Sequence, residues 1–256
     1  MLYKFVICFI AGIGAGLGTG FAGMSAAAVI SPMLIPFLDM PPYDAVGIAL
    51  ASDVLASGIS AYTYGKNKNL DIRNGLIMMA TVLVFTVVGS FVSKLVPSAA
   101  MGNFSVFMTF LLGVKFIVKP VMTTKETMQA ASAKKRAIQS VICGTVIGFI
   151  CGFVGAGGGM MMLLVLVSVL GYELKTAVGT SVFIMTFTAL TGALSHFAIG
   201  GGITDWSILV MCIVFTLAGA LVTAKFANKA SPKVMNRTLG FGLAAMSIAM
   251  LIVKYI

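Results

Sequence analysis

Two short glycine-rich stretches carry the residues of this 256-residue chain that are best suited to chemistry. The first stretch combines glycines with hydroxyl side chains, at Thr19, Gly20, Gly23 and Ser25. The second offers glycines that would let a ligand approach the backbone, at Gly155, Gly157, Gly158 and Gly159. A helix that begins after such a break directs unpaired backbone N–H groups and a positive dipole end at the gap. That arrangement binds an anion without a lysine. The alternative is that these glycines only let helices pack closely.

Asp53 is the one acid deep within an apolar segment, near its middle. A charge at the centre of a bilayer costs at least about 2.5 kcal/mol, so we expect this side chain to face a cavity or a partner. It could carry a proton, bind a cation or act as a hydrogen-bonded structural acid. Next to an anion site it makes most sense when protonated, which would tie solute binding to protons. His196, the only histidine, is a second candidate for proton coupling, or a polar anchor near a helix end.

Thr180 and Ser181 complete the predicted solute-binding set, because we place them in the first turn of a helix, where N–H groups remain free. The cysteines Cys8, Cys143, Cys151 and Cys212 all lie in apolar runs without a CxxC motif. We interpret them as buried free thiols. No His/Cys cluster has metal-ligand spacing, so we predict neither a metal nor another cofactor. Met160, Met161 and Met162 are interpreted as packing rather than a copper path.

Composition places these residues in a lipid bilayer. The mean hydropathy is +1.08 and charged residues make up only 9% of the chain, against roughly 25% in a soluble domain. The net charge of +10 does not indicate nucleic acid, because the charges lie in short gaps between apolar runs and not on amphipathic elements. The apolar N-terminal run continues to Leu38 with no clear processing site, which favours a retained membrane segment over a cleaved signal peptide.

The apolar runs predict an all-α polytopic membrane protein. They cover residues 5–38, 45–64, 76–92, 104–118, 137–170, 177–199, 206–224 and 239–253. The runs 5–38 and 137–170 are too long for one comfortable span and short for two. Glycine-rich breaks at residues 19–23 and 155–159 interrupt them. We predict that each long run is a helical hairpin, formed either by two short tilted spans or by a re-entrant pair.

The chain resembles itself at an offset of about 132 residues. At this offset the matching residues are Gly12, Gly16, Gly20 and Gly23 with Gly144, Gly148, Gly152 and Gly155, and residues 45–47 with residues 177–179. With a two-residue slip, Asp71 falls on Asp205. We predict two repeats, 1–118 and 137–256, joined by the basic linker 119–136.

Corresponding loops of the two repeats have opposite charge bias, which indicates opposite orientation. Each repeat has about five helical segments, and an odd number also requires inversion. The basic loops at 66–73, 119–136, 175 and 225–237 then all lie in the cytoplasm, as the positive-inside rule demands. Inverted repeats with broken helices are typical of secondary transporters, which bind solute near mid-membrane. We therefore predict a transporter of the plasma (inner) membrane with a cytoplasmic 119–136 loop.

With these features the chain resembles the TauE/SafE family of membrane permeases, described as sulfite exporters. The resemblance rests on the second break (residues 152–159), on the Ala-Val-Gly-Thr-Ser motif at 177–181, and on two repeats joined by a basic loop. It implies a small anionic substrate such as sulfite, a sulfonate or a related sulfur-containing anion. The first repeat departs from this pattern, with residues 24–27 in place of the glycine run and residues 48–49 in place of Thr180 and Ser181.

Three hypotheses compete with a proton-coupled anion transporter. A channel or passive uniporter would share the fold without coupling. A transporter of a cation or neutral solute would use Asp53 as a ligand. An intramembrane serine hydrolase would need Ser25 and His196, but the sequence around Ser25 only weakly resembles a nucleophile motif. We favour the transporter over an enzyme, with the bilayer, a small anion and protons as its partners. The sequence does not predict an oligomeric state.

Overall fold

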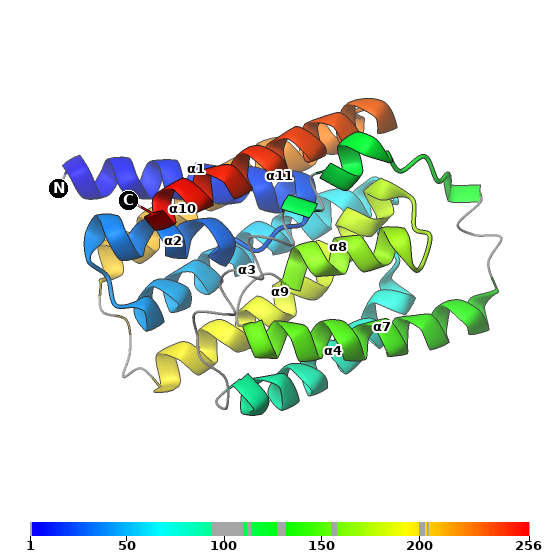
Figure 1. The fold of residues 1–256 in the computed structure, drawn as a ribbon, viewed down its shortest axis with the longest axis horizontal. Helices are drawn as coiled ribbons and strands as arrows, with labels where there is room; N and C mark the ends of the chain where they lie inside the picture. Colours follow the sequence, from blue (N-terminus) through cyan, green and yellow to red (C-terminus); the bar gives the residue numbers. More distant parts are fainter. Residues whose placement is uncertain are drawn as a thin grey trace.

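The computed structural model describes residues 2–93, 110–111, 114–126, 132–154, 158–199, 203 and 205–255. Helices account for the regular structure in these ranges (Figure 1). The N-terminal half of the chain has α1 (Leu2–Ala22), α2 (Ala27–Leu38), α3 (Pro42–Lys66) and α4 (Ile72–Ser93). The C-terminal half has α7 (Ala133–Val154), α8 (Gly158–Ser168), α9 (Leu174–Ile199), α10 (Trp206–Lys229) and α11 (Pro232–Tyr255). Of the predicted segment 104–118, residues 110–111 and 114–118 are described, and they are helical.

The described helices suit a bilayer. Four of those that could be assessed are long and apolar enough to cross a membrane: Leu2–Ala22, Asp44–Lys66, Leu174–Ala198 and Trp206–Lys229. Large apolar side chains such as Phe9, Val84 and Val222 are exposed on the outer helix faces, where lipid would cover them. These features confirm a multi-pass integral membrane protein.

Each long apolar run contains two helices, as the hairpin prediction requires. The first break nevertheless begins later than predicted, because Thr19 and Gly20 still belong to α1 and only residues 23–26 leave the helix. Gly23 adopts φ +62°, a left-handed conformation that only glycine enters without steric cost. Its N–H donates to the Thr19 carbonyl at 3.0 Å, so the last turn of α1 is closed before the chain reverses.

Four helix pairs make the most extensive contacts between the two halves of the chain: α1 packs on α10, α4 on α7, and α3 on both α9 and α10. The α1–α10 contact is very close, since a methyl group added to Gly16 would meet the backbone of Thr216 and Ala220. Gly148 of α7 is equally confined by the backbone of Val82 on α4. These glycines therefore allow direct contact between helix backbones.

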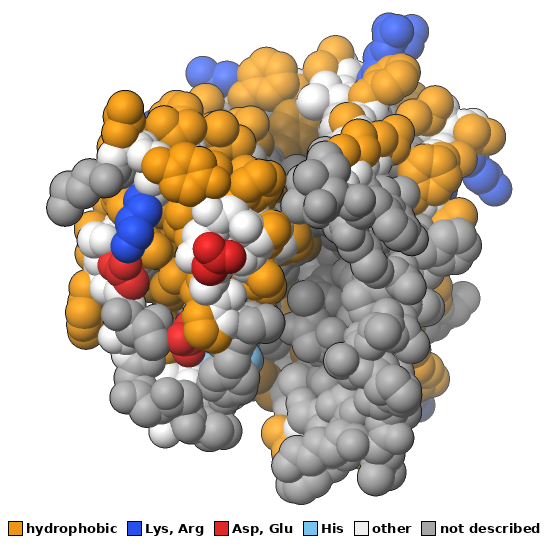
Figure 2. All heavy atoms as spheres, turned by 60° about the vertical axis from the view of Figure 1, so that its left-hand side comes forward, with side chains coloured by type: hydrophobic (Ala, Val, Ile, Leu, Met, Phe, Trp, Pro, Cys, Tyr) orange, Lys and Arg blue, Asp and Glu red, His pale blue; other side chains and the backbone are white. Residues whose placement is uncertain are grey.

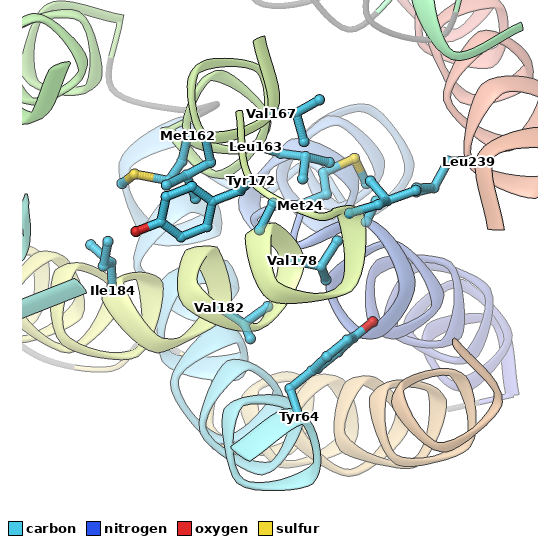
Figure 3. Close-up of a cluster of buried hydrophobic side chains, with 14 of the residues drawn as sticks. Met24, Tyr64, Met162, Leu163, Val167, Tyr172, Val178, Val182, Ile184 and Leu239 are labelled. Atoms are coloured by element: carbon cyan, nitrogen blue, oxygen red, sulfur yellow. The ribbon is translucent and has the colours of Figure 1, made fainter. Parts of the chain in front are cut away.

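A buried apolar cluster joins the first break to the second half of the chain. Figure 3 shows Met24 of the break among Leu163 and Val167 of α8 and Val178 of α9. In the same view the hydroxyl of Tyr64 points towards α1, where it donates to the Gly20 carbonyl at 3.1 Å. The break is thus held by packing on one side and by α3 on the other.

The two ends of the molecule differ in charge. In Figure 1 both termini lie at the left, while the C-terminal ends of α3 and α10 and the start of α7 lie at the right. The right-hand ends carry basic residues, among them Lys66, Lys134 and Lys229. Figure 2 brings the left-hand end forward and shows acidic side chains on it, with lysine and arginine mainly at the far edges. Basic residues therefore concentrate at one end of the molecule, as the loops predict, although Asp71 and Glu173 also lie at that end.

Candidate functional site

The carboxylate of Asp53 lies midway along α3, where it is 1% exposed. Ser25 Oγ donates to Asp53 Oδ2 at 2.8 Å, and the backbone N–H of Ala26 lies close to the same carboxylate. Thr19 Oγ1 lies 3.4 Å from Asp53 Oδ1 and donates to the Met24 carbonyl at 2.8 Å. The acid therefore has a partner at mid-helix, as the cost of burying a carboxylate demands.

These contacts place Asp53 at the start of α2. Ser25 and Ala26 immediately precede that helix, and Ser25 Oγ also accepts the Ala27 N–H at 3.4 Å. The donors that the first break was expected to present to a bound anion are therefore turned towards a carboxylate of the protein itself. Such an arrangement resembles an anion at a helix N-terminus, with Asp53 in the place of the anion.

The second break lies against the first. Gly159, in the first turn of α8, is so close to the Gly23 carbonyl and to Met185 that an added methyl group would clash with both. From α9, Ser181 Oγ donates to the same Gly23 carbonyl at 3.2 Å. Gly158 begins α8, whereas Gly155 and Gly157 lie outside the described residues. Elements α1, α8 and α9 thus meet at Gly23.

The prediction that Thr180 and Ser181 lie in the first turn of their helix is wrong. Helix α9 begins at Leu174, because Glu173 caps it by accepting the Thr176 N–H at 3.0 Å. Thr180 and Ser181 therefore follow the first turn, and their hydroxyls make tertiary contacts. Ser181 contacts the first break, and Thr180 Oγ1 accepts the Asp71 N–H at 3.2 Å. The capping acid, three residues before Thr176, is the signal that sequence reasoning missed.

His196 is half-buried near the end of α9, where its Cβ lies beside Gly47. Gly47 precedes Asp53 on α3 by about 9 Å of helix rise. The two candidates for proton coupling therefore lie at different depths. Ser25 donates its hydroxyl to Asp53 and not to the imidazole, so the arrangement that a serine hydrolase would need does not form.

No group of three or more metal-binding side chains occurs in the part of the chain searched. Of the cysteines, Cys8, Cys143 and Cys212 are buried free thiols, as their apolar surroundings predict, while the side chain of Cys151 lies outside the description. Cys8 and Cys212 face each other between α1 and α10.

Sequence reasoning missed a polar cluster at the basic end. Asp71, before α4, accepts hydrogen bonds from the hydroxyl of Tyr172 at 2.8 Å and from Nδ2 of Asn74 at 2.7 Å. Arg136 Nη1 of α7 lies 4.0 Å from Asp71 Oδ2. Burial raises the pKa of the Tyr172 hydroxyl, and the Asp71 carboxylate raises it further. The alignment of Asp71 with Asp205 singled out one member, but nothing in the spacing linked it to the others.

Comparison with known proteins gives a consistent result. The profile of the family described as "Sulfite exporter TauE/SafE" matches residues 8–250. "Probable membrane transporter protein YdhB" of Bacillus subtilis is 25% identical over 88% of this chain and 91% of its own length. YunE of the same organism, with the same description, is 28% identical over 77% and 80%. A further protein so described, from Methanocaldococcus jannaschii, is 26% identical over 96% and 94%. No solved structure matches.

Proposed function

The chain belongs to the sulfite exporter TauE/SafE family of membrane transporters, and we propose that it carries small sulfur-containing oxyanions, such as sulfite or sulfonates, across the cytoplasmic membrane. In this proposal two inverted repeats alternate access to a site between the helix breaks, and Asp53 couples the anion to a proton. The observation that carries the proposal is the meeting of the two breaks at Gly23, Ser181 and Gly159 beside the buried Asp53.

Equivalent packing of equivalent glycines supports the inverted repeats. Gly16 abuts the carbonyl of Thr216, and its repeat partner Gly148 abuts the carbonyl of Val82. Val82 and Thr216 are themselves partners at the slipped offset of Asp71 and Asp205. In Figure 1 α1 runs from left to right and α7 from right to left, which is the relation that inversion requires.

Equivalent helix ends give independent support. Asp39 after α2 and Gly171 after α8 both have left-handed φ values, +49° and +65°. Asp71 accepts the N–H of Asn74 at the start of α4, just as Asp205 accepts the N–H of Ile208 at the start of α10. Chance similarity of glycine-rich helices would not reproduce caps as well as contacts.

Asp53 supplies the proposed coupling. When it is ionised, its carboxylate occupies the donors of Ser25 and Ala26, and a solute anion would meet like charge. Protonation removes that charge and releases the donors to the anion. One anion would then bind together with one proton on Asp53, and neither the anion nor the proton alone would stabilise the solute-bound state. The repeat partner of Asp53 is Met185, so the start of α8 has no competing acid.

The same contacts favour an anion over a cation at this site. A cation ligand needs free carboxylate oxygens, whereas Asp53 faces the hydroxyl of Ser25, the N–H of Ala26 and Thr19 Oγ1. The positive-inside rule supports placing the basic ends of α3, α7 and α10 in the cytoplasm.

Flux measurements with purified protein in liposomes test the proposal. Sulfite, thiosulfate, sulfoacetate and simple carboxylates would be supplied with and without a pH gradient. We expect saturable uptake of a sulfur oxyanion that increases when protons move in the same direction. Saturable flux that ignores the gradient would leave a uniporter. Absence of anion flux from folded protein would remove this substrate class.

A further inference from the structure

Two buried polar atoms on helix α7 have no hydrogen-bond partner among the described residues: Arg136 Nε and Ser140 Oγ. The two residues are one helical turn apart, so their side chains leave the same face of α7. Ser140 is completely buried, and the Arg136 side chain is 16% exposed. Buried donors without partners cost free energy, and the described residues do not supply a partner for this pair.

The nearby acid does not satisfy Arg136. The distance from Arg136 Nη1 to Asp71 Oδ2 is 4.0 Å, the limit for an ion pair. Asp71 already accepts from the Tyr172 hydroxyl, from Asn74 Nδ2 and from the Asn74 N–H at 3.1 Å. These neutral donors satisfy the carboxylate oxygens of Asp71 as hydrogen-bond acceptors. The Arg136 guanidinium therefore keeps N–H donors, Nε–H among them, that the described residues do not use.

Among the residues that the structure describes, the equivalent positions at the opposite end have no such surplus. At the offset of about 132 residues, Arg136 corresponds to Lys4 and Ser140 corresponds to Cys8. Lys4 Nζ lies 2.9 Å from Asp205 Oδ2, a closed ion pair. Cys8 is buried against Cys212. Two related positions thus form a closed contact at the acidic end and leave free donors at the basic end.

We propose that Arg136 and Ser140 bind an oxyanion at the basic end of the α4–α7 pair, and that this is where the transported anion is first captured from that side. Arg136 provides the charge and the Nε–H donor, and Ser140 provides a neutral donor one turn deeper. The inference extends the proposed function, on which its second clause rests. The phosphate of a lipid headgroup has the same chemistry, so the test must separate it from a free ion.

The test is calorimetric titration of sulfite, and separately of sulfate, into purified protein in nanodiscs made only of phosphatidylcholine. The variants are Ser140→Ala and Arg136→Lys, which keeps the charge but loses Nε–H. The matched controls are Ser60→Ala, a fully buried serine whose hydroxyl already donates to the Ala56 carbonyl at 2.7 Å, and Lys4→Gln at the opposite end. We expect binding about tenfold weaker in both variants, as for loss of one hydrogen bond to a charged group, and wild-type binding in both controls.

Unchanged affinity in both variants, or no anion binding by the wild-type protein, would overturn the site. Retention of phosphatidylglycerol by the wild-type protein but not by the variants, with no binding of free ions in phosphatidylcholine nanodiscs, would assign the donors to a lipid and overturn the capture of solute. Flux in liposomes distinguishes failure of the Arg136–Ser140 site from failure of the proposed transport function. Wild-type binding that the variants weaken, without any anion flux, would retain the site and refute the proposed function. Anion flux with binding that is equal in the wild-type protein and the variants would support the proposed function and refute the site.

Discussion

Ser25 Oγ lies 2.8 Å from Asp53 Oδ2, so the residue that precedes α2 is bonded to the acid at the middle of α3. This contact places a carboxylate of the same chain at the N-terminus of α2, where a bound anion would otherwise lie. A solute that uses these donors must either displace that carboxylate or bind when Asp53 is protonated.

Asp53→Asn should separate solute movement from the proton gradient. The amide is uncharged at every pH, so it resembles the protonated acid and no longer repels an anion. We expect downhill anion exchange to persist within a few-fold of wild type, while pH-driven accumulation in liposomes is lost. The control is Asp44→Asn, an acid in the first turn of the same helix. Wild-type pH dependence in Asp53→Asn would exclude Asp53 as the coupling group.

Gly159→Ala should abolish transport in protein that still folds, although the added methyl group also lowers its stability, as it does in Gly16→Ala and Gly148→Ala. The new methyl group would meet the Gly23 carbonyl and Met185, and so would separate the two breaks. Flux in liposomes would fall at least tenfold, while size-exclusion chromatography in detergent shows an unchanged protein. Gly242→Ala on α11 is the matched control, since nothing lies within 4 Å of its added methyl group. Full activity of Gly159→Ala would show that solute does not pass this junction.

Gly16→Ala and Gly148→Ala should destabilise the protein by similar amounts, because each forces a methyl group against the backbone of a neighbouring helix. Overpacking of this kind costs about 1–3 kcal/mol, which thermal unfolding in detergent would detect as a lower midpoint. Gly14→Ala serves as the control, since its methyl group would make only ordinary contact with Val29 at 3.5 Å. A large loss in one variant and none in its partner would count against equivalent packing of the repeats.

Asp205→Ala should weaken the start of α10 in a pH-dependent way. The Ser207 hydroxyl, with the Lys4 ammonium and the Ile208 N–H, holds the pKa of Asp205 at about 2, below the value of about 3.9 in an unfolded chain. The carboxylate therefore stabilises the fold above pH ~4, and this contribution disappears as the pH falls towards ~2. Loss of such a cap costs about 0.5–2 kcal/mol.

Denaturant unfolding of wild type and Asp205→Ala at neutral and acidic pH would measure this difference. The two proteins should differ at pH 7 and converge in acid. A gap that stays constant across the titration would assign the effect to packing and not to the charge.

The sequence predicted the features that depend on local chemistry. Hydropathy located the membrane segments, and glycine spacing located the hairpins, because a break must fall where backbone freedom is greatest. Glycine spacing predicts that the first break begins at Thr19, four residues before Gly23, where the chain leaves the helix. The difference arises because glycine content alone does not show which residue adopts a positive φ. The sequence prediction placed Thr180 in a first turn because Glu173 was not recognised as a cap.

The partners of the candidate site could not be predicted, because they are tertiary. Asp53 was identified as needing a partner, but helix periodicity does not say that Ser25 on a different element supplies it. The contact of Gly159 with Gly23, and the cluster of Asp71 with Tyr172, likewise depend on how α8 and α4 lie against their neighbours.

The pairing of α1 with α10 and of α4 with α7 means that each half of the chain completes the other. A fragment ending before the basic linker would expose the glycine face of α1 without the backbone that fills it. This fragment and the complementary C-terminal fragment should therefore reassemble when they are expressed together. Either fragment alone should self-associate or be degraded. If the two halves are the repeats that we propose, a single-repeat ancestor would have required two copies to make one folded unit.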